Sequence, residues 1–197
     1  MRQSTIQLLG AALMLCCLQG HALAQRRRAV VVQNTFGTET PIRRPVRLSR
    51  DVVRQILASD PDGVRTCIEH AGESAAEIAR GLVGSSIDIN GDGVLDLVAQ
   101  AATSRCFMGA HSTTFWVFSK AETRLAPGHD LTLTSGADYL AVLRKKTNGF
   151  RDIETGNHTA VEMYTTVWKF DGEKYQPREC AVETFRTRKK VRVLCQR

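Results

Sequence analysis

The chain has 197 residues, a hydrophobic fraction of 43% and a formal net charge of +7. This length and composition correspond to one domain with enough apolar side chains for a buried core. The positive charge favours anionic partners such as an envelope polymer or a protein. No aromatic residues interleave the basic clusters, which argues against a single-stranded nucleic-acid platform. A solvated tail and a charged hairpin face explain the same clusters without any partner.

Residues 1–24 have the pattern of a signal peptide. Arg2 supplies the positive region, Leu8–Leu18 the apolar region, and Ala22-Leu23-Ala24 the cleavage site. The apolar run is too short to span a bilayer. We therefore expect cleavage after Ala24 and an exported mature chain, secreted or periplasmic, without a membrane span.

The remaining chain divides into a leader and one domain. Residues 25–48 contain arginine, threonine and proline with little hydrophobic periodicity, which predicts a flexible basic leader. A single α+β domain is predicted over 49–197, with helices over 49–84 and a β-rich part over 85–197.

Helix signals come first in this domain, and strand signals follow. Ser49 can cap a first helix, Gly72 can close a second, and a third is predicted over Glu73–Leu82. Alternating β-branched and aromatic residues predict strands at Leu95–Ala101, Thr113–Ser119, Leu131–Thr134, Tyr139–Arg144, Val161–Phe170 and Val191–Leu194. This order predicts an α+β fold with an antiparallel, meander-like sheet.

The β-rich part also contains a faint two-fold internal repeat. Gly93–Leu97 is echoed by Gly149–Ile153, and Thr113–Phe118 is echoed by Thr165–Phe170. Two landmarks in the same order indicate a duplicated loop-and-strands unit, and chance matching of common β residues is the alternative. The second loop has Asn148 where the first has acids, so we expect a turn without metal.

The stretch from Asp88 to Leu97 has the pattern of a calcium loop that runs directly into a strand. An EF-hand loop takes oxygen ligands from positions 1, 3, 5, 7 and 9, with glycine at position 6. The candidate ligands are the side chains of Asp88, Asn90, Asp92 and Asp96 and the carbonyl of Val94. Ala99 stands where an EF-hand has its bidentate glutamate. The alternative is a solvated turn whose side chains satisfy their own backbone.

This pattern, Asp-x-Asn-Gly-Asp-Gly-x-x-Asp-Leu, resembles the calcium loop of FG-GAP repeats and, over nine positions, that of dockerins. Together with Asn148–Ile153 and Val167–Tyr175, it resembles uncharacterised secreted bacterial proteins that carry one such loop. The resemblance implies that the five candidate ligands hold a structural Ca²⁺. The β-rich part is too short for the four or more blades of a closed propeller, and a strand follows the loop where dockerins have a helix.

Four cysteines follow the predicted signal peptide, and four cysteines allow three pairings. Cys180 and Cys195 flank an alternating segment and would face each other in a hairpin, which leaves Cys67 with Cys106. Free thiols are the alternative, and an oxidising compartment disfavours them. Zinc has no support from these cysteines, because no two of them share a C-x₂₋₄-C spacing.

No catalytic motif is present: the chain lacks G-x-S-x-G, a P-loop and paired zinc-ligand histidines. His111 stands beside Ser112 and Thr113, an arrangement that could hold a base and a nucleophile, although a loop-capping role is the simpler interpretation. Trp116 and Trp168 lie in alternating strands, where a core position is the default. If both face one side of the sheet, they form an aromatic binding surface.

Two functional classes follow. The first is an exported, non-catalytic, calcium-stabilised module that binds an envelope polymer, a glycan or a protein. The alternative is a small secreted hydrolase or a lysozyme-type hydrolase inhibitor, in which His111 or His129 would carry any turnover. Because no catalytic pattern is present, we expect binding. The ligand, the partner and the oligomeric state do not follow from the sequence.

Overall fold

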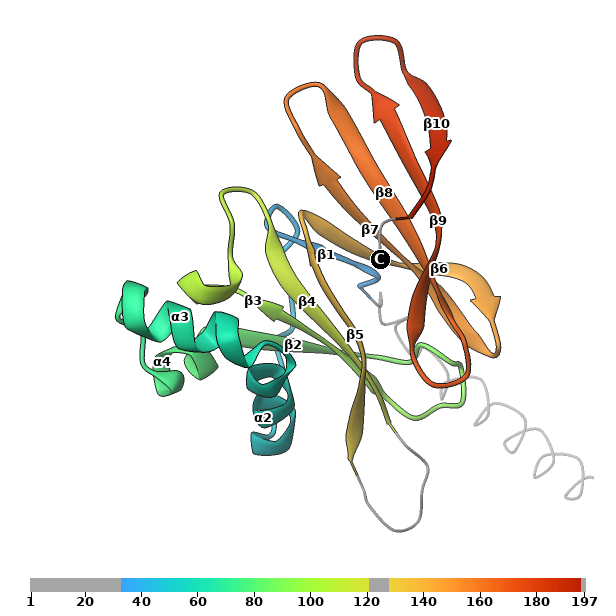
Figure 1. Cartoon of the computed structure of the whole chain (residues 1–197). Coiled ribbons are helices and arrows are strands. Elements are labelled where there is room, and N and C mark those ends of the chain that lie inside the picture. The colour runs from blue at the N-terminus through green and yellow to red at the C-terminus, as the bar shows by residue number, and fades with distance from the viewer. Residues whose placement is uncertain (1–32, 121–127, 196–197) are drawn as a thin grey trace, which may run out of the picture. The chain divides into compact units, whose positions relative to one another are not determined.

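The computed structural model describes residues 33–120 and 128–195 (Figure 1). The predicted signal peptide and the first part of the predicted leader, residues 25–32, lie outside the described residues. In the described part of the chain, no helix is long and apolar enough to cross a membrane.

Three helices form where the capping signals predict them, and they are α2 (Arg50–Ser59), α3 (Pro61–Ala71) and α4 (Ala75–Arg80). The Ser49 side chain accepts a backbone hydrogen bond at the start of α2, as expected of an N-cap. Gly72 ends α3 at φ 68°, a left-handed conformation that costs glycine little. Ser74 and Glu77 form a capping box that starts α4. The third helix is shorter than the predicted Glu73–Leu82, because it ends at Arg80 and Leu82 already belongs to a strand.

The described strands form two antiparallel sheets (Figure 1). The four-stranded sheet has the order β2 (Leu82–Ile87), β3 (Asp96–Ala101), β4 (Thr113–Lys120) and β5 (His129–Ala137). The six-stranded sheet has the order β1 (Thr35–Gly37), β6 (Tyr139–Thr147), β7 (Phe150–His158), β8 (Glu162–Phe170), β9 (Tyr175–Thr184) and β10 (Lys189–Val193). Apart from β1, which pairs with β6, sequence neighbours pair within each sheet, so the predicted α+β fold with a meander is confirmed.

The four-stranded sheet is covered on both faces. Its strands alternate, so that Trp116 and Phe118 of β4 pack with the helices while Phe115 and Val117 pack toward the other sheet. All six residues of β3 are consequently buried. One core therefore lies between helices and sheet, and a second lies between the two sheets.

The far half of the six-stranded sheet, β8 to β10, is open by comparison. Every residue of β10 is exposed, and most of β8 is only partly buried. Tyr164, Val182 and Val191 are cross-strand partners in adjacent strands, so their side chains share one face. Tyr164 and Val191 remain 44% and 47% exposed.

The predicted flexible leader does not hold for residues 33–48. Strand β1 lies inside it and pairs with β6, and Phe36 is completely buried between the sheets. Val46 forms a bridge with Gly84, which attaches the rest of this segment to β2. A three-residue strand is too short to show periodicity, so its burial follows from packing across the sheet.

Both halves of the internal repeat are a strand followed by its antiparallel partner, but they lie in different sheets. The first contains β3 and β4, and the second contains β7 and β8. Asn148 and Gly149 connect β6 to β7 with φ of 49° and 85°, as a tight two-residue hairpin turn requires.

Candidate functional site

The predicted calcium loop is folded by its own side chains. Asp88 accepts the backbone N–H groups of Gly91 and Gly93 at 2.6 and 3.1 Å. Asn90 and Asp92 each accept the N–H two residues further on, at 3.0 and 2.6 Å. Gly91 and Gly93 have φ of 79° and 84°, which glycine adopts without a steric cost. The side-chain oxygens of positions 1, 3 and 5 therefore order the turn.

Asp96, at the end of the loop, is hydrogen-bonded to the start of the loop. It is 2% exposed, and its two carboxylate oxygens accept the backbone N–H groups of Ile89 at 2.8 Å and Lys120 at 3.0 Å. Burial raises the pKa of this carboxyl, and the nearby charges of Asp92 and Asp88 raise it further against the two hydrogen bonds. Asp96 thus connects the start of the loop to the end of β4.

The donor set fits a hard cation in its chemistry. Three carboxylates, one amide oxygen and the Val94 carbonyl are the oxygen ligands that Ca²⁺ prefers. A carboxylate has about four lone-pair positions, and the hydrogen bonds of the three loop aspartates leave part of that capacity free. The Lys146 ammonium group lies beside this loop, where its Nζ donates to the Asn90 carbonyl at 2.6 Å.

The loop carboxylates are not drawn together around one point. Among the described residues, the acidic, cysteine and histidine ligand atoms that all lie within 4.8 Å of one another belong to Cys67, Glu73 and Cys106. A bound cation would have to pull the three aspartates of the loop closer. The five predicted ligands therefore share one loop, in which backbone N–H groups and, for Asp92, the Asn90 side-chain amide at 2.7 Å already occupy several of their side-chain oxygens.

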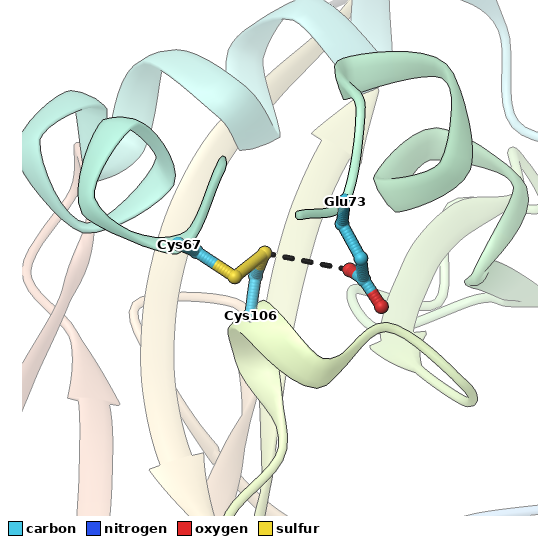
Figure 2. Close-up of side chains that lie close together, drawn as sticks. All are labelled: Cys67, Glu73 and Cys106. Atoms are coloured by element: carbon cyan, nitrogen blue, oxygen red, sulfur yellow. Dashed lines mark hydrogen bonds between the residues drawn. A yellow bond between two sulfur atoms is a disulfide. The ribbon is translucent and has the colours of Figure 1, made fainter. Parts of the chain in front are cut away.

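The Cys67, Glu73 and Cys106 cluster has a structural role, because it links neighbouring segments by a disulfide and hydrogen bonds (Figure 2). Cys67 and Cys106 form a disulfide, so neither sulfur is a thiolate that could bind metal. Glu73 lies 3.4 Å from the Cys106 Sγ and also accepts hydrogen bonds from Ser104 Oγ and Arg105 N, both at 3.0 Å. Together they attach α3 to the short helix η1 (Arg105–Phe107).

The second disulfide joins Cys180 of β9 to Cys195, beyond β10. Both predicted disulfides are therefore present, in the pairing expected from the hairpin. The Cys180–Cys195 disulfide ties the chain after β10 back to β9, and so stabilises the edge of the open half-sheet.

The two tryptophans do not form one surface. Trp116 is completely buried on the helix side of the four-stranded sheet, where its Nε1 donates to Ser59 Oγ at 3.1 Å. Trp168 lies in the other sheet, partly buried, and its Nε1 donates to Thr155 Oγ1 at 2.8 Å. The prediction of an aromatic binding surface is wrong, because the two tryptophans lie in different sheets and pack against different cores.

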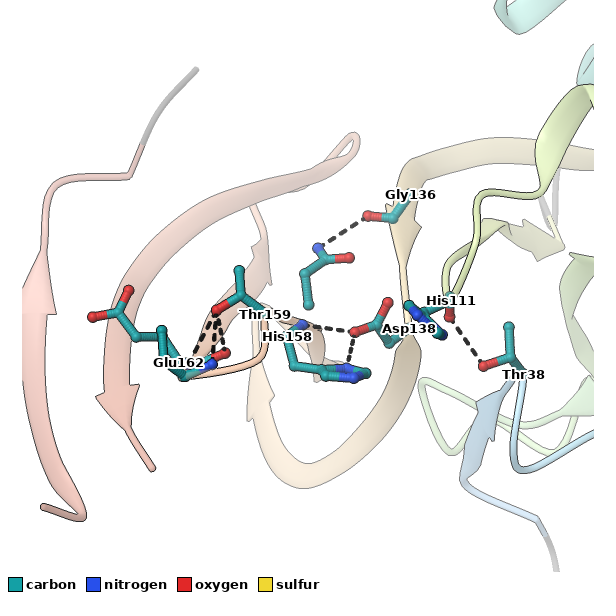
Figure 3. Close-up of polar contacts among 9 residues, drawn as sticks. Thr38, His111, Gly136, Asp138, His158, Thr159 and Glu162 are labelled. Atoms are coloured by element: carbon teal, nitrogen blue, oxygen red, sulfur yellow. Dashed lines mark hydrogen bonds and ion pairs between the residues drawn. The ribbon is translucent and has the colours of Figure 1, made fainter. Parts of the chain in front are cut away.

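Two histidines that are distant in sequence lie side by side (Figure 3). The ring centres of His111 and His158 are 5.8 Å apart, and both residues line a cavity of about 440 Å³ with Asp138 and Tyr139. Burial raises the pKa of the Tyr139 hydroxyl, and the hydrogen bond of this hydroxyl to Glu154 raises the pKa further. His129 starts β5, at the opposite end of that strand from Asp138. Sequence spacing contains no signal for the His111–His158 pair.

A second cavity, of about 390 Å³, lies on the open half-sheet. Its charged lining residues are Glu154, Glu179, Lys190 and Arg192. Lys169 bonds to Glu179 at 2.5 Å beside it, and this contact lowers the pKa of the Glu179 carboxyl. The cavity thus combines acidic and basic groups on a surface formed by β7 to β10.

Comparison with known proteins gave no match. No protein-family model matches the chain, and neither curated proteins nor solved structures give a significant match.

Proposed function

We propose that this chain is an exported, non-catalytic binding module, stabilised by calcium and two disulfides, whose binding surface is the open half-sheet of β8 to β10. The observation that carries this proposal is the exposure of that half-sheet, including an edge strand exposed at every residue. Disulfide bonds are typical of chains that fold in an oxidising compartment, which supports export.

The loop from Asp88 to Asp96 supplies the calcium part of the proposal. Asp88, Asn90, Asp92 and Asp96 would hold the ion with the Val94 carbonyl. Mutual repulsion of three carboxylates in one turn is relieved when a cation neutralises them. Since the ion binds the folded loop, occupancy at a hundredfold excess over the Kd stabilises the fold by about 2.7 kcal/mol.

Calorimetric titration tests the calcium part. The purified chain should bind one Ca²⁺, and Asp92→Ala should abolish the saturable heat. Asp171→Ala is the matched control, because Asp171, like Asp92, accepts hydrogen bonds from the backbone of its own turn, here two N–H groups at 2.9 Å, but lies outside the loop. Absence of saturable heat at millimolar calcium, or equal binding by Asp92→Ala, would remove calcium from the proposal.

The charge of the edge strand indicates the kind of partner. The segment 186–192 contains five basic residues and no acid, and Arg188 forms an ion pair with Glu183 at 3.7 Å. Edge-to-edge pairing of two copies would bring like charges together, which opposes self-association. An anionic polymer or an acidic protein segment would instead meet complementary charge.

Cosedimentation with isolated, anionic cell-envelope material tests the surface. Lys190→Glu combined with Arg192→Glu should reduce retention at least tenfold, and added salt should weaken binding of the unaltered chain. Arg43→Glu with Arg44→Glu is the control for net charge, since both arginines are exposed but lie far from β10 in sequence. Equal loss in both variants would show that net charge, and not this surface, is responsible.

The alternative is a small secreted hydrolase or a lysozyme-type hydrolase inhibitor. The observation in its favour is the hydrogen bond between Asp138 and His158 beside a cavity, because a carboxylate that orients an imidazole is a frequent arrangement for a general base. Turnover of an ester, phosphate or peptidoglycan substrate that disappears in His158→Gln would favour an enzyme. Retention on envelope material without turnover favours the binding module.

A further inference from the structure

The cavity beside His158 lies where the chain passes from one sheet to the other. Asp138 is the single residue between β5 and β6. The end of β1, the loop before β4 and the end of β7 meet at this point and contribute Glu39, His111 and His158 to the same lining. A change of sheet thus gathers polar side chains from four separate segments.

The imidazole of His158 is held in one orientation (Figure 3). One carboxylate oxygen of Asp138 meets both the backbone N–H of His158, at 2.6 Å, and its Nδ1, at 2.5 Å. An ionised carboxylate only accepts hydrogen bonds, so Nδ1 carries a proton, and in the neutral imidazole this leaves the lone pair on Nε2. The His158 side chain is 41% exposed and that of Asp138 is 13% exposed, which leaves the ring accessible over a shielded carboxylate.

His111 is positioned by its backbone. Gly109 N donates to the Ser112 carbonyl at 2.8 Å, which closes the turn around it. Thr38 Oγ1 donates to the His111 carbonyl at 3.1 Å (Figure 3). These bonds fix the backbone of His111 next to β1, while its exposed side chain is free to change rotamer.

We propose that His158 Nε2 and the His111 imidazole bind one divalent transition-metal cation, such as Zn²⁺, with Asp138 as the carboxylate that orients His158. With Zn–N distances near 2.0 Å and tetrahedral geometry, the ring centres of two ligating histidines lie about 5 Å apart. The observed 5.8 Å is close to this value, and a change of rotamer at His111 would turn its ring toward the ion. A carboxylate behind a ligating histidine is the usual outer partner in such sites.

The cavity offers further ligands and selectivity. Glu39 lines the same cavity and provides a carboxylate, and water can complete the coordination sphere. Imidazole favours Zn²⁺, Cu²⁺ and Ni²⁺ over Ca²⁺, whereas the oxygen ligands of the loop at Asp88 favour Ca²⁺. The two sites therefore take different ions, and the histidine site goes beyond the proposed binding function.

Zinc titration of the full chain, with calcium present throughout at saturating concentration, tests this site. One Zn²⁺ should bind, and His111→Gln or His158→Gln should each weaken binding at least tenfold. Asp138→Asn should weaken it by about 10- to 100-fold, as loss of an outer carboxylate does. Co²⁺ in place of Zn²⁺ should give visible absorption that both histidine variants change.

His70→Gln and His129→Gln are the matched controls, since neither residue lines the cavity. Both should bind zinc like the unaltered chain. Far-ultraviolet circular dichroism and the calcium titration show whether each variant is folded. Undetectable zinc binding, or unchanged affinity in the folded His111→Gln/His158→Gln double variant, would overturn the proposal, as would an equal loss in His70→Gln.

Discussion

The two halves of the predicted internal repeat have similar sequences and differ in what surrounds them. In the first, Asp96 is held by two backbone N–H groups, and Trp116 is completely buried under the helices. In the second, Asp152 is fully buried, yet neither carboxylate oxygen has a hydrogen-bond partner among the described residues. Trp168, the counterpart of Trp116, stays partly exposed.

The difference shows what each half contributes. The first half has helices on one face and the six-stranded sheet on the other, so its strands contribute to both cores. The second half continues into the open half-sheet, where most residues of β8 are only partly buried. We therefore expect substitutions in the first half to affect stability and those in the second half to affect the surface.

Removal of the two tryptophans gives the largest expected contrast. Trp116→Ala leaves a cavity in a closed core and should lower the free energy of unfolding by about 3–5 kcal/mol. Trp168→Ala should cost clearly less, because its side chain already meets solvent. Urea unfolding followed by circular dichroism measures both. Equal costs would show that the second half is as well packed as the first.

The two counterpart aspartates give the next contrast. Asp96→Asn replaces one accepting carboxylate oxygen with an NH₂ group, which then faces one of the two backbone N–H donors. This should lower the free energy of unfolding by about 1–3 kcal/mol. Asp152→Asn replaces a buried carboxyl group that lacks a hydrogen-bond partner in the described part of the chain, so the free energy of unfolding should be unchanged or higher. Both are measured by urea unfolding in a calcium chelator, which separates the effect from metal binding. A large loss in Asp152→Asn would contradict the comparison.

The smallest expected effect is on the outer face of the second half. Lys169 lowers the folded-state pKa of Glu179 from its ordinary 4.5, so this pair stabilises the fold above pH 4.5 and stops doing so as pH falls through the lowered value. Glu179→Gln should be slightly less stable than the unaltered chain at pH 7. The gap in melting temperature should close in strong acid, and also at 1 M salt. A gap that widens in acid would show another role for Glu179.

Local signals in the sequence predicted much of the scaffold. Ser49 and Gly72 marked helix ends correctly because a cap is satisfied by residues three or four positions away. The disulfide between Cys180 and Cys195 followed from the alternation of one hairpin. The calcium loop pattern likewise depends on neighbouring residues, and its hydrogen bonds connect positions two to five apart.

Contacts between distant segments could not be predicted in this way. Phe36 was assigned to a flexible leader, although β1 pairs with β6 across a hundred residues of intervening chain. His111 and His158 meet only because the chain changes sheets at Asp138. Both depend on which strands pair and which faces are covered, and no local window records that.

The sequence by itself determined the helix caps, the acidic loop, the cysteine hairpin and six of the strands, while β1, β2, β7 and β9 were not among the predicted strands. Each feature that it determined is stabilised by hydrogen bonds or packing within a short segment. The tertiary structure decided which tryptophan is buried, which aspartate is satisfied and which histidines are neighbours. Those outcomes depend on how two sheets share one core, where the gain from burying distant side chains exceeds the entropy lost in bringing them together.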